Sequence, residues 1–156
     1  MSGVIFGPSQ VVPEEMDCPD VLIMHGCNLL AEAGAQFHVG GFGQDDWNLD
    51  VNYDLPIFIE QVPPLMDALA VNEEYELWLY SQGVERVLAF CPDPEKVKIR
   101  CRSKTEWRPV PEVEVVERFA FEALLAGLVG NFLSSLQIVD PFLVQLEPFA
   151  SWRRRW

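Results

Sequence analysis

Hydrophobic and polar residues alternate most regularly in the middle of the chain, with the period of two that is typical of β-strands. Three such segments follow one another: "YELWLYS", "VERVLAF" and "VKIRCRSK". The segments Gln82-Gly83 and "CPDPE" separate them, and glycine and proline favour tight turns. A further strand is predicted in "PEVEVVE". Both faces of the first segment are apolar, including Trp78 and Tyr80, which predicts a strand covered on both sides.

From about residue 117 to residue 139 the period changes to that of a helix. Large apolar residues recur there at steps of three and four: Phe121, Leu124, Leu125, Leu128, Phe132 and Leu136. This spacing predicts a long helix with a buried stripe. Asp140-Pro141 ends it, and a short final helix is predicted in "FLVQLEPFASW". Because the strands precede the main helix, we expect an α+β fold, an antiparallel meander with one long C-terminal helix packed on one face.

The first part of the chain is less regular. Residues 1–20 are predicted to form an irregular N-terminal arm with a short strand at 4–6, and residues 21–156 are predicted to form a single α+β domain. "VLIMHGCNLL" and "AQFHVGGFG" predict two short strands separated by a turn at Gly34. In "LPIFIEQVPPLMDALAVN" a helix is favoured over a strand at 57–60. Asp54 would cap this helix, Pro56 would lie in its first turn, and Pro63-Pro64 would restart it.

The segment "DDWNLDVNYD" alternates without interruption and predicts a strand. Trp47, Leu49, Val51 and Tyr53 would face the core. The opposite face is a candidate partner-binding surface made of Asp45, Asp46, Asn48, Asp50, Asn52 and Asp54. Asp and Asn are poor strand formers, and a basic protein partner would explain their presence. A calcium loop is excluded by its spacing, because Val51 stands where such a loop needs glycine.

Charge is divided unequally along the chain. The formal net charge is −13, and residues 1–85 hold 15 acids and no Lys or Arg, whereas residues 86–156 hold all 11 bases. This balance argues against nucleic acid or an anionic membrane as a partner of the whole surface. It favours a basic protein partner, and the binding of one is the leading hypothesis.

Charge pairing within the protein explains the acidic face nearly as well as a basic partner does. A second row of alternating residues consists of Lys96, Lys98, Arg100, Arg102 and Lys104. If the acidic and basic strands were neighbours, their charges would pair across the sheet. Glu112 and Glu114 are alternative partners of the basic row. The terminal arginines in "SWRRRW" fit the end of the last helix or the acidic half of the chain better than they fit phosphate.

His25, Cys27 and His38 are the only candidates for metal binding or nucleophilic catalysis. A buried cysteine beside a hydrogen-bonded histidine is commoner than a catalytic pair, and the chain has no C-x-x-C, P-loop, H-E-x-x-H or G-x-S-x-G motif. We therefore expect no catalytic residues, no metal and no cofactor. A small metal-binding enzyme around these three residues is the least favoured alternative, after a structural or adaptor protein that forms a homodimer.

Localisation is predicted to be cytoplasmic. The N-terminus "MSGVIFGPSQ" lacks the basic start and apolar run of a signal peptide. The apolar region 119–146 is interrupted by Glu122, Asn131, Asp140 and Pro141, so no membrane span is expected. The four cysteines form no recognisable disulfide framework, which fits a reducing compartment.

The order of elements resembles small bacterial α+β proteins that act as immunity partners of polymorphic toxins. The resemblance rests on "YELWLYSQGVERVLAF", "VKIRCRS", "EWRP" and "PEVE" followed by the long helix, and it covers roughly residues 27–136. It includes no short motif, so no residue role is transferred. The resemblance implies a non-enzymatic protein that neutralises a cognate toxin domain by masking its active site.

Overall fold

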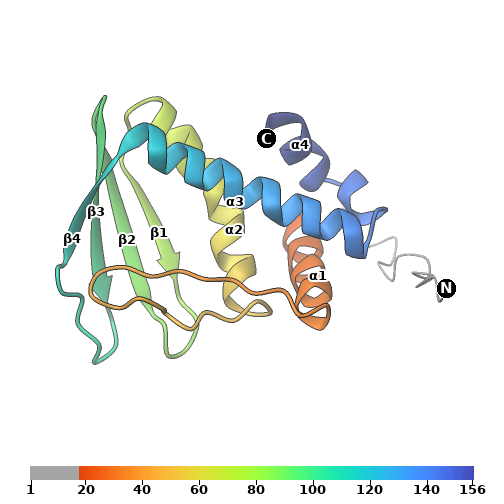
Figure 1. The fold of residues 1–156 in the computed structure, drawn as a ribbon, viewed down its shortest axis with the longest axis horizontal. Coiled ribbons are helices and arrows are strands. Elements are labelled where there is room, and N and C mark those ends of the chain that lie inside the picture. The colour runs from red at the N-terminus through yellow and green to blue at the C-terminus, as the bar shows by residue number, and fades with distance from the viewer. Residues whose placement is uncertain (1–17) are drawn as a thin grey trace.

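The structure is a computed structural model that describes residues 18–156. Its elements are α1 (Pro19–Glu32), α2 (Asp54–Ala70), β1 (Tyr75–Leu79), β2 (Arg86–Pro92), β3 (Lys96–Ser103), β4 (Val113–Glu117), α3 (Arg118–Val139), the 3-10 turn η2 (Leu143–Gln145) and α4 (Phe149–Arg155). The predicted α+β fold is confirmed. Helices α2 and α3 lie against one face of a four-stranded antiparallel sheet, and α1 and α4 pack beside them (Figure 1).

The sheet is the predicted meander, with strand order β1-β2-β3-β4. In β3 the residues Val97, Ile99 and Cys101 are buried, while the Lys and Arg residues between them are exposed. The register places Leu88 of β2 between Leu77 and Cys101, so the buried side chains of neighbouring strands form rows beneath the helices. Burying each large apolar side chain contributes about 1.5–3 kcal/mol, which explains why the alternating pattern fixes this register.

Strand β1 lies at the edge of the sheet, so the prediction that it is covered on both sides was wrong. Its inward residues Leu77 and Leu79 are buried, but Trp78 is 40% exposed and Tyr80 is 63% exposed. The side chain of Gln61 in α2 covers part of the open edge. Its amide accepts from the Trp78 backbone N–H and donates to the Trp78 carbonyl, both at 2.9 Å, as a neighbouring strand would.

Helix α3 has the predicted length and position. Leu125, Phe132 and Leu136 of the predicted stripe are buried, but Leu124 is 67% exposed and was wrongly assigned to it. By length and composition α3 also qualifies as a candidate membrane span, contrary to the expectation from its polar interruptions. The same helix contacts α1, α2 and the sheet, and 28% of its apolar window is buried inside the protein.

The helix predicted after residue 54 is confirmed as α2, with Pro56 in its first turn. Its details differ from the prediction in two ways. Tyr53, and not Asp54, occupies the capping position, and no side chain caps the helix there. Pro63 and Pro64 lie inside one continuous helix and do not restart it.

Residues 19–32 form the helix α1, where a strand was predicted. The apolar residues Leu22, Ile23, Cys27 and Leu30 are buried, and their spacing places them on one helical face. Pro19 stands at the start of the helix, where its missing N–H costs nothing. The β-branched and apolar composition of the segment was mistaken for a strand signal. The predicted strand at 4–6 lies outside the described residues.

The second predicted strand of this region, residues 35–43, is part of a loop that runs from α1 to α2. The loop runs from α1 to the β4 edge of the sheet and returns to α2 (Figure 1). The Phe42 carbonyl accepts from Val110 N–H at 2.8 Å and Glu114 Oε1 accepts from Phe42 N–H at 2.8 Å. The Arg86 guanidinium lies over both the Trp47 and the Trp107 ring, 4.4 and 3.7 Å from their centroids, and the two rings meet edge to face. These contacts hold the loop on the protein without strand pairing.

Candidate functional site

The acidic segment 45–54 is not a strand, so that prediction was wrong. Asp46 Oδ1 accepts from Asn48 N–H at 2.8 Å, and Asp50 Oδ1 accepts from Asn52 N–H at 2.6 Å. Each bond joins residues two apart and closes a tight turn. Asn48 also has a positive φ of 53°, which asparagine tolerates better than most residues. The alternation of acids and amides therefore shapes a loop.

The division of this segment into a buried and an exposed side is partly as predicted. Trp47 and Leu49 are buried, whereas Tyr53 is 70% exposed instead of facing the core. The segment ends in a turn that leads directly into α2: the Asp50 carbonyl accepts from the N–H groups of Asp54 and Leu55. This turn, and not a sheet, positions the last three polar residues.

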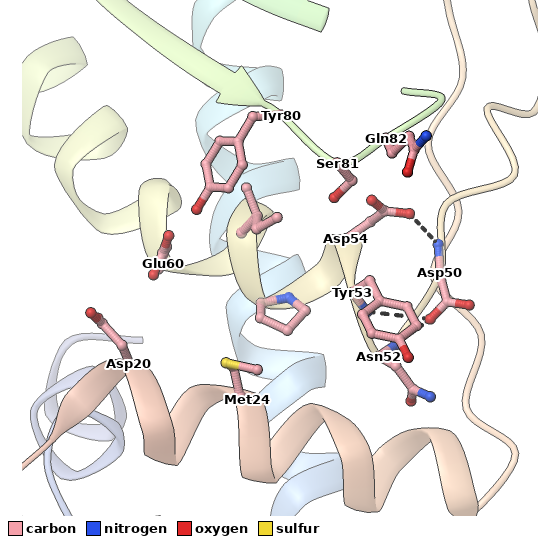
Figure 2. Close-up of a pocket in the computed structure, with 12 residues that line it drawn as sticks. Asp20, Met24, Asp50, Asn52, Tyr53, Asp54, Glu60, Tyr80, Ser81 and Gln82 are labelled. Atoms are coloured by element: carbon pink, nitrogen blue, oxygen red, sulfur yellow. Dashed lines mark hydrogen bonds between the residues drawn. The ribbon is translucent and has the colours of Figure 1, made fainter. Parts of the chain in front are cut away.

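Asp50, Asn52 and Asp54 lie together at a cleft of about 680 Å³ (Figure 2). We call it the acidic cleft. Its walls come from α1, the end of the loop, the first turns of α2 and the segment after β1, and its residues are Asp20, Met24, Asp50, Asn52, Tyr53, Asp54, Pro56, Ile57, Glu60, Tyr80, Ser81 and Gln82.

The other residues of the predicted surface lie elsewhere. Asp46 and Asn48 line a second cleft with His38, and Asp45 lines neither cleft. Asp46 Oδ1 is 3.6 Å from His38 Nδ1. Asp50 and Asn52 line both clefts, and of the predicted surface only Asp50, Asn52 and Asp54 line the acidic cleft.

Among residues 18–156, four carboxylates line the acidic cleft and no Lys, Arg or His does. Burial, followed by the charge of Asp20, raises the pKa of Glu60. Burial and the charge of Glu60 raise the pKa of Tyr75 nearby. Burial is the larger cause of both shifts, and the charge of a neighbouring carboxylate is the smaller one.

Asp54 is the most buried of these carboxylates, with 5% of its surface exposed. Its Oδ2 accepts from the Asp50 backbone N–H at 2.7 Å. Within residues 18–156 its Oδ1 is buried without a hydrogen-bond donor, and so is Oδ1 of Asn52. Buried polar atoms are nearly always paired, so both oxygens are exceptions.

The basic row of β3 does not pair with the acidic segment, so the internal explanation was wrong in that form. The row lies on the sheet face opposite the helices. Arg102 pairs with Glu76 at 2.8 Å and Arg100 with Glu112 at 3.8 Å. Glu112 is thus one of the alternative partners named from the sequence, whereas Glu114 binds the loop instead.

The terminal arginines contact acidic groups of the protein itself, one of the two arrangements favoured from the sequence. They lie in the last turn of α4. Arg155 pairs with Asp67 of α2 at 2.6 Å, and Arg154 pairs with Glu147 at 3.2 Å. These pairs neutralise acids that lie outside the acidic cleft.

His25, Cys27 and His38 do not come together. Within residues 18–156 no group of three or more His, Cys, Asp or Glu side chains is placed to hold a metal ion. Burial raises the pKa of the Cys27 thiol to about 12, which disfavours the thiolate that a nucleophile or metal ligand needs.

The sequence reasoning missed Asp20, Glu60 and Tyr80 as members of the acidic cleft. Glu60 lies on the same predicted helix as Asp54, but residues six apart do not share a helical face, so the helix alone did not indicate that both line one cleft. Asp20 was not, because its segment was assigned to an irregular arm. Tyr80 was placed in the core.

Comparison with known proteins gives no further guide, because no protein-family model, characterised protein or solved structure matches this chain.

Proposed function

We propose that this chain is a non-enzymatic binding protein whose acidic cleft takes a basic protein partner. The observation that carries the proposal is the set of four carboxylates, Asp20, Asp50, Asp54 and Glu60, lining one cleft that no base of the described residues lines. Opposed charges across an interface steer encounter and select the partner. The exposed rings of Tyr53 and Tyr80 at the same cleft are of a kind enriched at protein interfaces.

In the specific form of this proposal the chain is an immunity-like protein that neutralises a basic toxin domain in the cytoplasm by masking its active site. The resemblance in element order supports this form. So does the acidic cleft, because an enzyme that acts on nucleic acid presents a basic groove that an anionic protein can cover. A carboxylate-lined surface would occupy the positions that phosphates otherwise take.

A structural or adaptor role as a homodimer is the second candidate, and a specific observation favours it. The side of α3 turned away from the core carries the exposed apolar residues Phe119, Leu124 and Ile138. Apolar surface of this kind marks association sites when it is contiguous. A monomeric mass by sedimentation at high protein concentration would remove this candidate.

The experiment for the proposed function begins with capture from a lysate of the native host. The chain serves as bait, and bound protein is eluted by raising the salt concentration. We expect one basic protein that binds at low salt and leaves at high salt. Expressed alone in a sensitive bacterium, this protein should arrest growth, and co-expression of the chain should restore it. Growth arrest that the chain does not relieve would overturn the immunity form, and failure of any basic protein to bind would overturn the proposal itself.

A further inference from the structure

We propose that a third cleft, between the loop that precedes α2, the sheet and α3, binds one uncharged aromatic small molecule. We call it the apolar cleft. It shares no lining residue with the acidic cleft. Binding here is therefore independent of the partner proposed for the acidic cleft.

The apolar cleft has a volume of about 620 Å³, and small-molecule sites typically have volumes of ~300–1,000 Å³. On the sheet it is lined by Leu88, Phe90 and Ile99, which face the helices. Phe58 of α2 and Leu125 of α3 line it as well, so four parts of the fold surround one space. Well-packed interiors contain few spaces larger than a water molecule, so a space of this size beside the core points to an occupant.

The opening of the apolar cleft lies between the loop and α3. The lining residues that are exposed to solvent all belong to these two segments: His38, Gly40, Ala123, Leu124, Gly127 and Asn131. A Cβ added at Gly127 would meet no atom of another described segment within 4 Å, so this side of the opening is free. A small molecule can therefore enter without displacing the backbone of α3.

The lining indicates an aromatic ligand. It includes six aromatic side chains: Phe37, Phe42, Trp47, Phe58, Phe90 and Phe121. These rings already form three pairs, with centroids 5.3 Å apart for Phe37 and Phe58, 6.2 Å for Phe42 and Trp47, and 5.7 Å for Phe90 and Phe121. Aromatic rings attract one another at such separations in addition to the gain from burial. A bound aromatic molecule would extend these contacts, whereas an alkyl chain would gain from burial alone.

The charges around the apolar cleft favour an uncharged ligand. Among residues 18–156 its lining contains one carboxylate, Glu114, and no Lys or Arg, and the exposed ring of His38 lies 3.6 Å from Asp46. Glu114 Oε1 already accepts from the Phe42 N–H at 2.8 Å. A ligand anion would meet negative charge without a fixed counter-charge, and a charge of either sign would lose its hydration among the rings. A hydroxyl group on the ligand can hydrogen-bond with Asn131 at the opening.

The experiment titrates the full chain with N-phenyl-1-naphthylamine, an uncharged aromatic probe whose fluorescence rises in apolar surroundings. We expect saturable binding of one probe per chain and displacement by 2-naphthol, which is uncharged at neutral pH. Decanol, an uncharged alkyl chain, and the charged analogues 2-naphthoate and 1-naphthylmethylammonium should displace the probe at least several-fold less well. Absence of saturable binding would overturn the site. Displacement by decanol or by a charged analogue as effective as that by 2-naphthol would overturn the proposed class of ligand.

Two matched variants of α3 locate the bound probe. Gly127→Leu places a side chain in the opening and should weaken probe binding at least several-fold. Gly130→Leu is the control, because its Cβ would also meet no atom of another described segment within 4 Å and the residue does not line the apolar cleft. It should leave binding unchanged. Both variants replace a glycine inside a helix, so neither should lower the melting temperature, which reports that the fold is intact.

A third variant separates the cleft from the exposed surface of the same helix. Ile138→Gln removes exposed apolar surface outside the apolar cleft and should leave probe binding unchanged. Unchanged binding by Gly127→Leu, or a loss of equal size for Gly130→Leu or Ile138→Gln, would overturn the apolar cleft as the site. The proposed function would be unaffected by either result, because it depends on a protein captured through the acidic cleft.

Discussion

The backbone N–H of Asp50 donates to Oδ2 of Asp54 at 2.7 Å, and this one bond joins the end of the acidic loop to the first turn of α2. It uses one oxygen of a carboxylate whose other oxygen is buried without a donor. The same residue thus fixes the shape of the acidic cleft and supplies its most buried negative charge. Asp54 thus has a structural role and a proposed binding role, so a substitution there must be compared with substitutions at residues that have only one of these roles.

Asp54→Ala should destabilise the protein by about 1–3 kcal/mol, because it leaves the Asp50 N–H without its charged acceptor. Urea unfolding measures the change. Asp45→Ala is the control, because Asp45 is exposed and lies outside the cleft; it should change stability by no more than about 0.5 kcal/mol. Equal losses for the two variants would show that the bond contributes nothing to the fold.

Glu60→Gln should stabilise the protein at neutral pH while it weakens partner binding. Burial and Asp20 raise the pKa of Glu60 above its usual 4.5, so the folded state holds this proton more tightly than the unfolded state does. Stability contributed by Glu60 therefore falls as pH rises from about 4.5 through the raised pKa, and the penalty is complete above it.

The measurement is the melting temperature of both proteins at pH 4 and pH 7. The advantage of Glu60→Gln over the natural protein should be greater at pH 7 than at pH 4, where the carboxyl is largely protonated in either state. An advantage of the same size at both pH values would contradict a charge-based penalty at this position.

Arg86 is buried against Trp47 and Trp107, and the only hydrogen bond of its side chain within the described residues runs from Nη2 to Gln44 Oε1 at 3.0 Å. We expect Arg86→Ala to cost about 2–4 kcal/mol, because it empties the space beside the rings. Arg86→Met should cost less, since it fills that space and removes the buried donors Nε and Nη1 that have no partner. If the methionine variant were the less stable of the two, hydrogen bonding and charge would outweigh packing at this position.

Gln61→Ala should lower stability by about 1–2 kcal/mol and promote self-association, because it removes both hydrogen bonds to Trp78 at the open edge of β1. Light scattering during storage at high concentration reports the association. Gln61→Glu keeps the acceptor for the Trp78 N–H and loses the donor, so it should fall between the natural protein and Gln61→Ala. Unchanged stability and mass for both variants would show that α2 protects the edge without this side chain.

The sequence predicted the elements whose partners lie nearby along the chain. The meander from Tyr75 to Glu117 was predicted from an unbroken period of two, and the helix α3 from a period of three to four. In these elements the position of a residue within its own strand or helix decides which side it faces. Even so, the pattern did not reveal that β1 is an edge strand, since Trp78 is as apolar as a buried residue and only the neighbouring elements decide its exposure.

The acidic segment shows why the rest could not be predicted. Asp46 and Asp50 alternate with apolar residues as in a strand, but their carboxylates bind backbone N–H groups two residues ahead, which costs less than leaving those groups unpaired in a loop. Alternation of apolar residues alone does not distinguish the two outcomes. Only some residues of the acidic cleft could be predicted from the sequence. Asp20 reaches the cleft through the packing of α1 beside α2, which no local pattern encodes.

We expect the acidic cleft, and not acidity in general, to bind the basic partner. Two double variants that remove equal charge test it directly. Asp20→Asn with Glu60→Gln neutralises two cleft carboxylates, whereas Glu32→Gln with Glu73→Gln neutralises two exposed acids outside the cleft. Affinity for the basic protein retained by the chain is measured by calorimetry at two salt concentrations. We predict at least about a tenfold loss, equivalent to 1.4 kcal/mol, for the cleft variant and little change for the other. Equal effects of the two variants would contradict the claim.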